Sequence, residues 1–146
     1  MPIEPDQAQM AEIAELAGAD GDGPVVMLNL NRYRERAEYD GDVPGGESSD
    51  VPGHEAYMRY GVVATEVLAR VGGRILWHTD SKRTVIGDET DRYDEVIAVW
   101  YPSLAAFAAL ATDPELLAAR PHRVAALERA ALVCCESGGE PLLAAA

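Results

Sequence analysis

Residues 23–33 read GPVVMLNLNRY, and this stretch decides the fold and places the candidate site. Successive side chains of a strand point to opposite faces, so Val26, Leu28 and Leu30 form one fully apolar stripe. The opposite stripe begins apolar and becomes rich in amides; it consists of Val25, Met27, Asn29, Asn31 and Tyr33. We expect this second stripe to face a semi-polar cavity and to carry the site, while the apolar stripe packs under helices.

Length and composition predict one globular domain. A chain of 146 residues can bury a core without disulfides, and 48% apolar with 25% charged residues is ordinary for a globular protein. Twelve basic residues against 25 acidic ones give a net charge of −13, which disfavours nucleic acid and anionic membranes as partners. No apolar run approaches a membrane span, and Glu4, Asp6 and Glu12 stand where a signal peptide would need basic residues.

The cysteine pattern favours a reducing compartment. Only Cys134 and Cys135 occur, and they are adjacent in the sequence. Because neighbours on a strand point to opposite faces, a mutual disulfide is not expected, and no CxxC redox motif is present. We therefore expect a cytoplasmic protein with two reduced, structural cysteines.

Gly, Pro and capping residues divide the chain into segments. The predicted strands cover 24–31, 73–79 with a hairpin partner over 84–87, 93–101 and 132–136. The predicted helices cover 5–17, closed by Gly18, and 54–71, and two more begin at Ser103 and at Asp113-Pro114. Pro121 is expected to interrupt the chain before a last helical stretch to about Arg129. Residues 34–53 are rich in Gly, Pro, Asp and Ser without apolar periodicity, so we expect a lid-like loop. The predicted organisation is an N-terminal helix and linker over 1–22, a folded domain over 23–137 and a flexible tail over 138–146.

Without the extra N-terminal helix, the order is β-α-β-β-α-β, the pattern of a ferredoxin-like α+β plait with an antiparallel sheet. In the strand over 93–101, Ile97, Val99 and Tyr101 form the better apolar stripe, which we expect to face the two helices. The opposite stripe consists of Asp94, Val96, Ala98 and Trp100. Since no second helical layer is available for that opposite face, we expect two copies to pair sheet to sheet as a homodimer that closes a barrel.

Several short motifs, in their order and spacing, resemble the longer members of a domain-of-unknown-function family, number 1330, in the dimeric α+β barrel superfamily. The matching motifs are MLNLNRY at 27–33, GHEAYMRY at 53–60, VGGR at 71–74, YPS at 101–103, DP at 113–114 and HR at 122–123. The likeness covers about residues 23–136. It implies a ferredoxin-like fold and a homodimer, and it implies no particular activity because the family has no agreed one.

Two kinds of side chain on the presumed cavity face are candidate ligand contacts. Asn29 and Asn31 can donate hydrogen bonds to a carbonyl or enolate oxygen, or they can bond each other, the backbone or water. Trp100 can stack on a planar ligand or simply fill the barrel.

His78 is the best candidate for proton transfer, because it ends its strand near the expected cavity rim and the ordinary pKa of imidazole lies near neutrality. The alternative is a solvated rim histidine. Tyr33 and Tyr57 complete the predicted ligand contacts, although Tyr57 shares a helical stripe with Tyr60 that also suits plain packing. His54 is expected to be an exposed neighbour of a helix cap.

The sequence contains no nucleophile elbow, phosphate-binding loop, calcium loop or zinc-ligand spacing, so we expect no metal or other cofactor. Two function classes fit. The first is a cofactor-independent oxygenase or isomerase that acts on a small, planar, hydrophobic, oxygenated molecule, as fold relatives do; the second is a non-catalytic binding module. A third alternative is a haem-degrading monooxygenase, because Asn29, Trp100 and His122 resemble the positions that such barrels use. An acidic protein is poorly suited to haem propionates, and His122 also reads as a locally satisfied helix-start residue.

Overall fold

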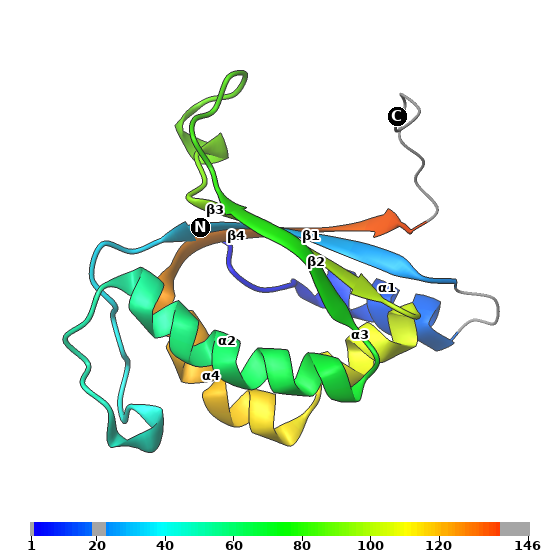
Figure 1. Ribbon diagram of the computed structural model, residues 1–146, viewed down its shortest axis with the longest axis horizontal. Helices are drawn as coiled ribbons and strands as arrows, with labels where there is room; N and C mark the ends of the chain where they lie inside the picture. Colours follow the sequence, from blue (N-terminus) through cyan, green and yellow to red (C-terminus); the bar gives the residue numbers. More distant parts are fainter. Residues whose placement is uncertain (1, 19–22, 138–146) are drawn as a thin grey trace.

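The predicted element order folds as one four-stranded antiparallel sheet with the strand order β2-β3-β1-β4 (Figure 1). The computed structural model describes residues 2–18 and 23–137; the predicted tail at 138–146 lies outside them. The elements are α1 (Gln7–Gly18), β1 (Val25–Tyr33), a 3₁₀ turn at Pro44–Gly46, α2 (Gly53–Arg70), β2 (Arg74–Asp80), a 3₁₀ turn at Glu89–Asp91, β3 (Glu95–Tyr101), α3 (Leu104–Ala111), α4 (Pro114–Ala126) and β4 (Leu127–Glu136). The chain is therefore a ferredoxin-like α+β protein, as its element order predicts.

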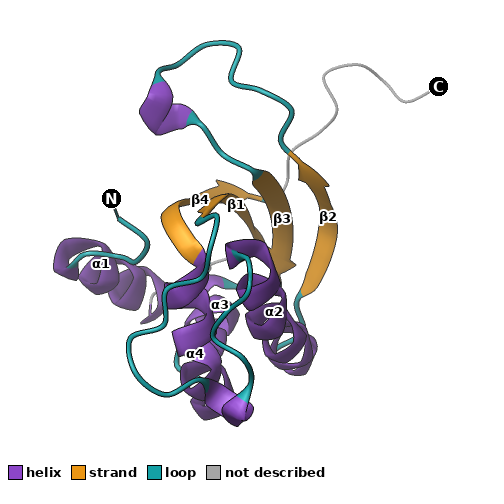
Figure 2. Ribbon diagram, turned by 90° about the vertical axis from the view of Figure 1, so that its left-hand side faces the viewer, coloured by secondary structure: helices purple, strands orange, loops and turns teal. Residues whose placement is uncertain are grey.

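The helices lie on one side of the sheet. Figures 1 and 2 both show α2, α3 and α4 below the strands, and among the described residues no helix covers the upper side, which we call the open face. The core between sheet and helices is built by Met27, Val67, Leu68, Val99, Tyr101, Leu104, Leu110 and Leu116. Removal of these side chains from water is the main stabilising term for the fold.

The helix ends follow the local signals in the sequence. Gly72 follows α2 with φ at +82°, a left-handed conformation that glycine adopts without steric cost. The hydroxyl of Ser103 accepts a hydrogen bond from the Ala106 amide at 3.0 Å and caps α3. At α4 the Asp113 carboxylate accepts from the amide of Glu115 at 2.9 Å, with proline at the first helical position.

Three predicted boundaries are wrong. α4 runs through Pro121 without a break. Proline has no N–H to donate to the Leu117 carbonyl, but both residues lie on the exposed side of the helix. β4 begins at Leu127 rather than at residue 132, because the segment predicted as helical pairs with the end of β1. Residues 84–87 form no strand, and β2 pairs with β3 instead.

The register of the sheet corrects the predicted faces of β1. As predicted, Ile97, Val99 and Tyr101 of β3 pack against the helices. Cross-strand partners share a face, and β1 pairs with β3 as Met27↔Val99 and Asn29↔Ile97. The amide-bearing stripe of β1 therefore faces the helices, and the fully apolar stripe lies on the open face.

This inversion has a simple physical cause. Both stripes of β1 begin with large apolar residues, so hydrophobicity alone could not distinguish the buried face from the open one. The amides of the buried stripe obtain hydrogen-bond partners inside the molecule, which removes the cost of their burial.

A β-bulge changes the faces along β2. The pairing of β2 with β3 shifts between Ile75 and Trp77, so the two ends of the strand are out of phase. Arg74 pairs with Trp100 on the open face, whereas His78 pairs with a residue of the helix-side face. Simple alternation would put Arg74 and His78 on one face, and the bulge instead places them on opposite faces of the sheet.

The loop over residues 34–52 is ordered by docking on α2 and α4. The Arg34 amide donates to the Ala126 carbonyl at 2.8 Å, and the Glu38 amide donates to the Ala125 carbonyl at 3.0 Å. Val51 is buried in this contact, and Arg59 of α2 forms an ion pair with Glu47 of the loop at 2.6 Å. The loop thus rests on helices of its own chain; its action as a lid remains a prediction.

Candidate functional site

Five polar side chains meet between the start of α2 and the strands β1 and β3. We call this group the polar cluster; it consists of Asn31, Tyr33, Tyr57, His78 and Glu95. β1 contributes the first two, α2 the third, β2 the fourth and β3 the last. Asn31 is only 2% exposed and Glu95 only 8%, so two strongly polar groups are held away from water at this end of the core.

Glu95 is the centre of the polar cluster. The hydroxyl of Tyr33 donates to its Oε1, and Nδ1 of His78 lies 3.4 Å from its Oε2. A buried carboxylate is costly unless such groups satisfy it. The two oxygens of one carboxylate thus connect a partly buried phenol with an imidazole whose side chain is 66% exposed.

The two tyrosines of the cluster are weaker acids than a tyrosine in water. Burial raises the pKa of Tyr33 well above its usual value, and the hydrogen bond to Glu95 raises it further. Burial also raises the pKa of Tyr57, against a smaller opposing effect of the Arg123 charge. Both hydroxyls therefore stay protonated and act as hydrogen-bond donors. The two rings pack with centroids 5.2 Å apart.

Asn31 helps to hold the Tyr33 side chain in place. Its Nδ2 donates to the Tyr33 hydroxyl at 3.4 Å, while its backbone carbonyl accepts from the Asp94 amide at 2.7 Å. The Asp94 carboxylate in turn accepts from the Tyr33 amide at 2.8 Å. These bonds fix the end of β1 and give the Tyr33 ring one orientation.

Asn29 and Trp100 lie outside the polar cluster. The amide of Asn29 donates to the carbonyls of Met27 and Ile97, both at 3.3 Å, which matches the alternative in which it satisfies the backbone. Trp100 lies on the open face, where its indole donates to the Ser137 hydroxyl at 2.9 Å. The predicted cavity wall that joins both amides to this indole is therefore wrong, because the sheet separates them.

The remaining histidines lie elsewhere. His54 is exposed, as expected, and its ring contacts the edge of the Tyr33 ring. His122 is buried in α4 rather than at a helix start, with its Nδ1 2.6 Å from the Tyr39 hydroxyl. Burial lowers the pKa of this imidazole. The haem-type arrangement fails on geometry, because the first-strand amide and the third-strand indole that it requires are on opposite faces of the sheet.

Glu95 is the residue that sequence reasoning missed. It begins the stripe of β3 that continues as Ile97, Val99 and Tyr101, and all four side chains point toward the helices. A carboxylate at the head of a core-facing stripe is the signal that could have identified it, because such a group must have a partner.

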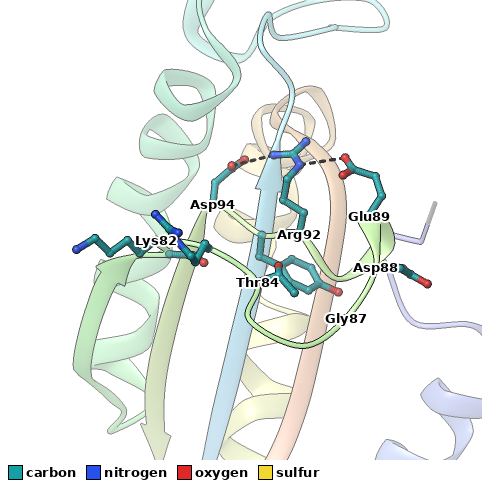
Figure 3. Close-up of a pocket in the computed structure, with 10 residues that line it drawn as sticks. Lys82, Thr84, Gly87, Asp88, Glu89, Arg92 and Asp94 are labelled. Atoms are coloured by element: carbon teal, nitrogen blue, oxygen red, sulfur yellow. Dashed lines mark hydrogen bonds and ion pairs between the residues drawn. The ribbon is translucent and has the colours of Figure 1, made fainter.

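Two surface hollows are separate from the polar cluster. One, of about 520 Å³, lies between β2 and β3 within residues 81–94 (Figure 3). Arg92 there bridges Glu89 at 3.1 Å and Asp94 at 3.4 Å, so its charged walls neutralise each other. The other, of about 270 Å³, lies beside α4, and no member of the polar cluster lines either hollow.

The described part of the chain contains neither a group of metal-ligating side chains nor a membrane-spanning helix. Within residues 2–18 and 23–137, no three or more His, Cys, Asp or Glu side chains are grouped so as to hold a metal ion. None of the described helices combines the length and the apolar content that crossing a bilayer requires.

Fold and site together define a ferredoxin-like α+β protein with a tyrosine paired to a buried carboxylate at one end of its sheet. The chain belongs to the family described as "Domain of unknown function (DUF1330)", whose profile matches residues 47–136. Comparison with the curated proteins finds no match.

Comparison with solved structures finds similar proteins. The RPA0582 protein of unknown function from Rhodopseudomonas palustris is 33% identical with a TM-score of 0.80, and the match covers 94% of this chain and 98% of that one. The methylated form of RPA0582 is 34% identical with a TM-score of 0.78 over the same shares. A dimeric protein of unknown function with a ferredoxin-like fold, from Bacteroides fragilis NCTC 9343, is 19% identical with a TM-score of 0.43, covering 78% of this chain and 96% of that one.

Proposed function

We propose that this protein is a cofactor-independent isomerase that moves a proton on a small, planar, oxygenated molecule at the polar cluster. One observation carries the proposal: the buried carboxylate of Glu95 holds a partly buried phenol on one oxygen and an exposed imidazole near the other. A carboxylate that orients a histidine is a common arrangement for a general base.

The exposed imidazole acts first. With Nδ1 directed at Glu95, the Nε2 lone pair of His78 is the free base, and the carboxylate stabilises the imidazolium that forms. Nε2 takes a proton from the carbon next to the substrate carbonyl, and the C–H electron pair moves onto the carbonyl oxygen as an enolate. The same imidazolium then delivers that proton to another carbon of the conjugated system, so atoms and charge balance and no second reactant is needed.

Donor groups of the polar cluster stabilise the enolate. Tyr57 stays protonated because burial raises its pKa, and it is a donor placed away from competing water. Asn31 hydrogen-bonds the hydroxyls of both Tyr33 and Tyr57, so it positions the phenols rather than the enolate itself. Fixed donors aimed at a developing oxyanion are typically worth about a hundredfold or more in rate.

A homodimer is part of this proposal. The open face carries apolar side chains from all four strands: Val26, Leu28, Leu30, Trp77, Val96, Trp100 and Val133. Trp77 is 50% exposed and Val133 is 48% exposed in the single chain. A continuous apolar face of this kind favours a self-complementary contact between two copies.

The experiment uses α-angelica lactone, a planar β,γ-unsaturated lactone whose conversion to the conjugated isomer requires this proton shift. We expect the wild-type protein to accelerate isomerisation and solvent deuterium exchange in a proton NMR time course, and His78→Gln and Glu95→Gln to lower the rate by about a hundredfold. Glu66→Gln, an exposed charge change on α2, is the matched control and should retain the wild-type rate. Equal rates for buffer, wild type and both variants would refute the isomerase.

A non-catalytic binding module is the second candidate. The polar cluster already satisfies many of its own hydrogen bonds, which leaves fewer groups free to take part in a reaction and suits a site that only binds. In that case the lactone should perturb the tyrosine ring signals of the wild type and leave them unchanged in Tyr57→Phe, while its isomerisation proceeds at the buffer rate.

A further inference from the structure

The connection between β2 and β3, residues 81–94, stands away from the body of the protein, and we call it the arm. Figures 1 and 2 show that it rises on the side of the sheet opposite the helices. Its tip is Val85-Ile86, and these side chains are 86% and 93% exposed, the highest values among the large exposed apolar side chains of the described residues. Two adjacent apolar residues at the end of a projecting loop need an explanation.

The arm is built to hold its shape. The Thr84 hydroxyl donates to the Asp91 carbonyl across the arm at 3.0 Å, and the Ser81 amide donates to the Asp94 carbonyl at its base at 2.8 Å. Asp88 and Asp91 form a reciprocal capping box around the short 3₁₀ turn. The apolar tip is therefore presented by a loop whose backbone is tied at several points.

Residues of the open face anchor the arm. Arg32, which is buried although it is charged, donates to the Glu89 carbonyl at 2.9 Å and pairs with the Glu128 carboxylate at 2.7 Å. Arg129, its cross-strand partner, donates to the Tyr93 hydroxyl at 3.0 Å. These bonds fix the arm at one end of the open face, so whatever covers that face also meets the arm.

We propose that the arm clasps a second copy of this chain, with Val85 and Ile86 packed against apolar surface of that copy. The inference rests on the homodimer of the proposed function and adds the contact that fixes how the copies engage. In a two-fold arrangement over the open faces, each arm projects toward the other subunit.

The charges of the arm are compatible with the same occupant. Each copy carries a net charge of −13, so two copies repel each other. The arm holds three cations and four carboxylates, but Glu89 and Asp94 are paired with Arg92, and Asp88 and Asp91 cap the 3₁₀ turn. Lys82, the only lysine of the sequence, and Arg83 stand next to the apolar tip, where they can pair with carboxylates of an acidic partner. A preformed loop also loses little conformational entropy when it docks.

The test compares two pairs of exposed apolar residues by sedimentation velocity over a range of protein concentrations. Val85→Ala with Ile86→Ala should raise the dimer dissociation constant at least about tenfold, because exposed anchors that become buried carry much of the binding energy. Met58→Ala with Val62→Ala on the outer side of α2 is the matched control, since those side chains are also more than half exposed. The control should dimerise like the wild type, and both variants should unfold at the wild-type urea concentration when measured as monomers.

The outcomes separate the two proposals. A wild-type dimer whose dissociation constant is unchanged by the arm substitutions would overturn the clasp and leave the homodimer standing. A wild type that sediments as a monomer at 100 μM, roughly a hundred times the 1 μM constant that about 8 kcal/mol of binding energy gives, would overturn both.

Discussion

Gly53 occupies a position where a methyl group does not fit, and Gly53→Ala tests how the loop is seated. A Cβ at this position would lie 2.1 Å from the carbonyl oxygen of Arg34 and 2.9 Å from that of Ala126. Neither neighbour is the flexible end of a side chain; both are backbone atoms at the junction of β1, the loop and α4. The constraint is space, because Gly53 has no positive φ.

The cost follows from what must move. Relief of the clash displaces the Arg34 carbonyl, which accepts a hydrogen bond from the Gly53 amide at 3.2 Å. It also disturbs the hydrogen bond that the Arg34 amide donates to the Ala126 carbonyl at 2.8 Å. Two backbone hydrogen bonds at about 1 kcal/mol each, with some lost packing around Val51, give a loss of about 3 kcal/mol in the free energy of unfolding.

Gly61→Ala is the control within the same helix. A Cβ there meets nothing within 4 Å, and alanine in a helix interior is better than glycine by about 0.5–1 kcal/mol. We expect opposite signs for the two variants in urea unfolding followed by tryptophan fluorescence, at one protein concentration because association adds stability. A Gly53→Ala protein within about 0.5 kcal/mol of wild type would show that the loop does not rest on α4 as described.

Two further predictions address charge and assembly. Burial lowers the pKa of His122, so its neutral form stabilises the fold above the ordinary histidine pKa, and that stability is lost as the pH falls through the lowered value. The urea midpoint of wild type should therefore fall more steeply between pH 7.5 and 5 than that of His122→Gln, with His54→Gln retaining the wild-type slope; equal slopes in all three would contradict it. Leu28→Asp, on the open face, should give a folded monomer by sedimentation and circular dichroism, whereas Met27→Asp, one residue earlier, should unfold the chain because it places a charge in the core. A persistent Leu28→Asp dimer would contradict the sheet-to-sheet contact.

The sequence was sufficient for the fold because its local signals agree with one another. Ser103, Asp113 and Gly72 mark helix ends by capping chemistry that needs no tertiary information. The core-facing stripe of β3 was also predictable, since its alternate residues differ clearly in apolar character. Each of these features depends only on neighbours in the chain.

The candidate site was only partly predictable, because its assembly depends on register. Four members of the polar cluster were predicted from residue type and do meet: Asn31, Tyr33, Tyr57 and His78. No local signal indicates the bulge that turns His78 toward Glu95. Two apolar stripes compete on β1, and only the pairing Asn29↔Ile97 decides between them. Register is set by contacts between strands far apart in the chain, and local periodicity carries no information about them.

The corrected register also connects the site with the proposed interface. β1 places Asn31 under the helices and, one residue later, Arg32 on the open face, where it holds the arm through Glu89. The arm begins after β2, shortly beyond His78, and ends directly before Glu95, so both strands that supply the acid–base pair continue directly into it. A partner that contacts the arm therefore affects the distance between His78 and Glu95, because the hydrogen-bonded backbone of the arm connects the two strands. Weakening the clasp should then change the proton-transfer rate as well as the dissociation constant, while a site independent of assembly would show only the latter.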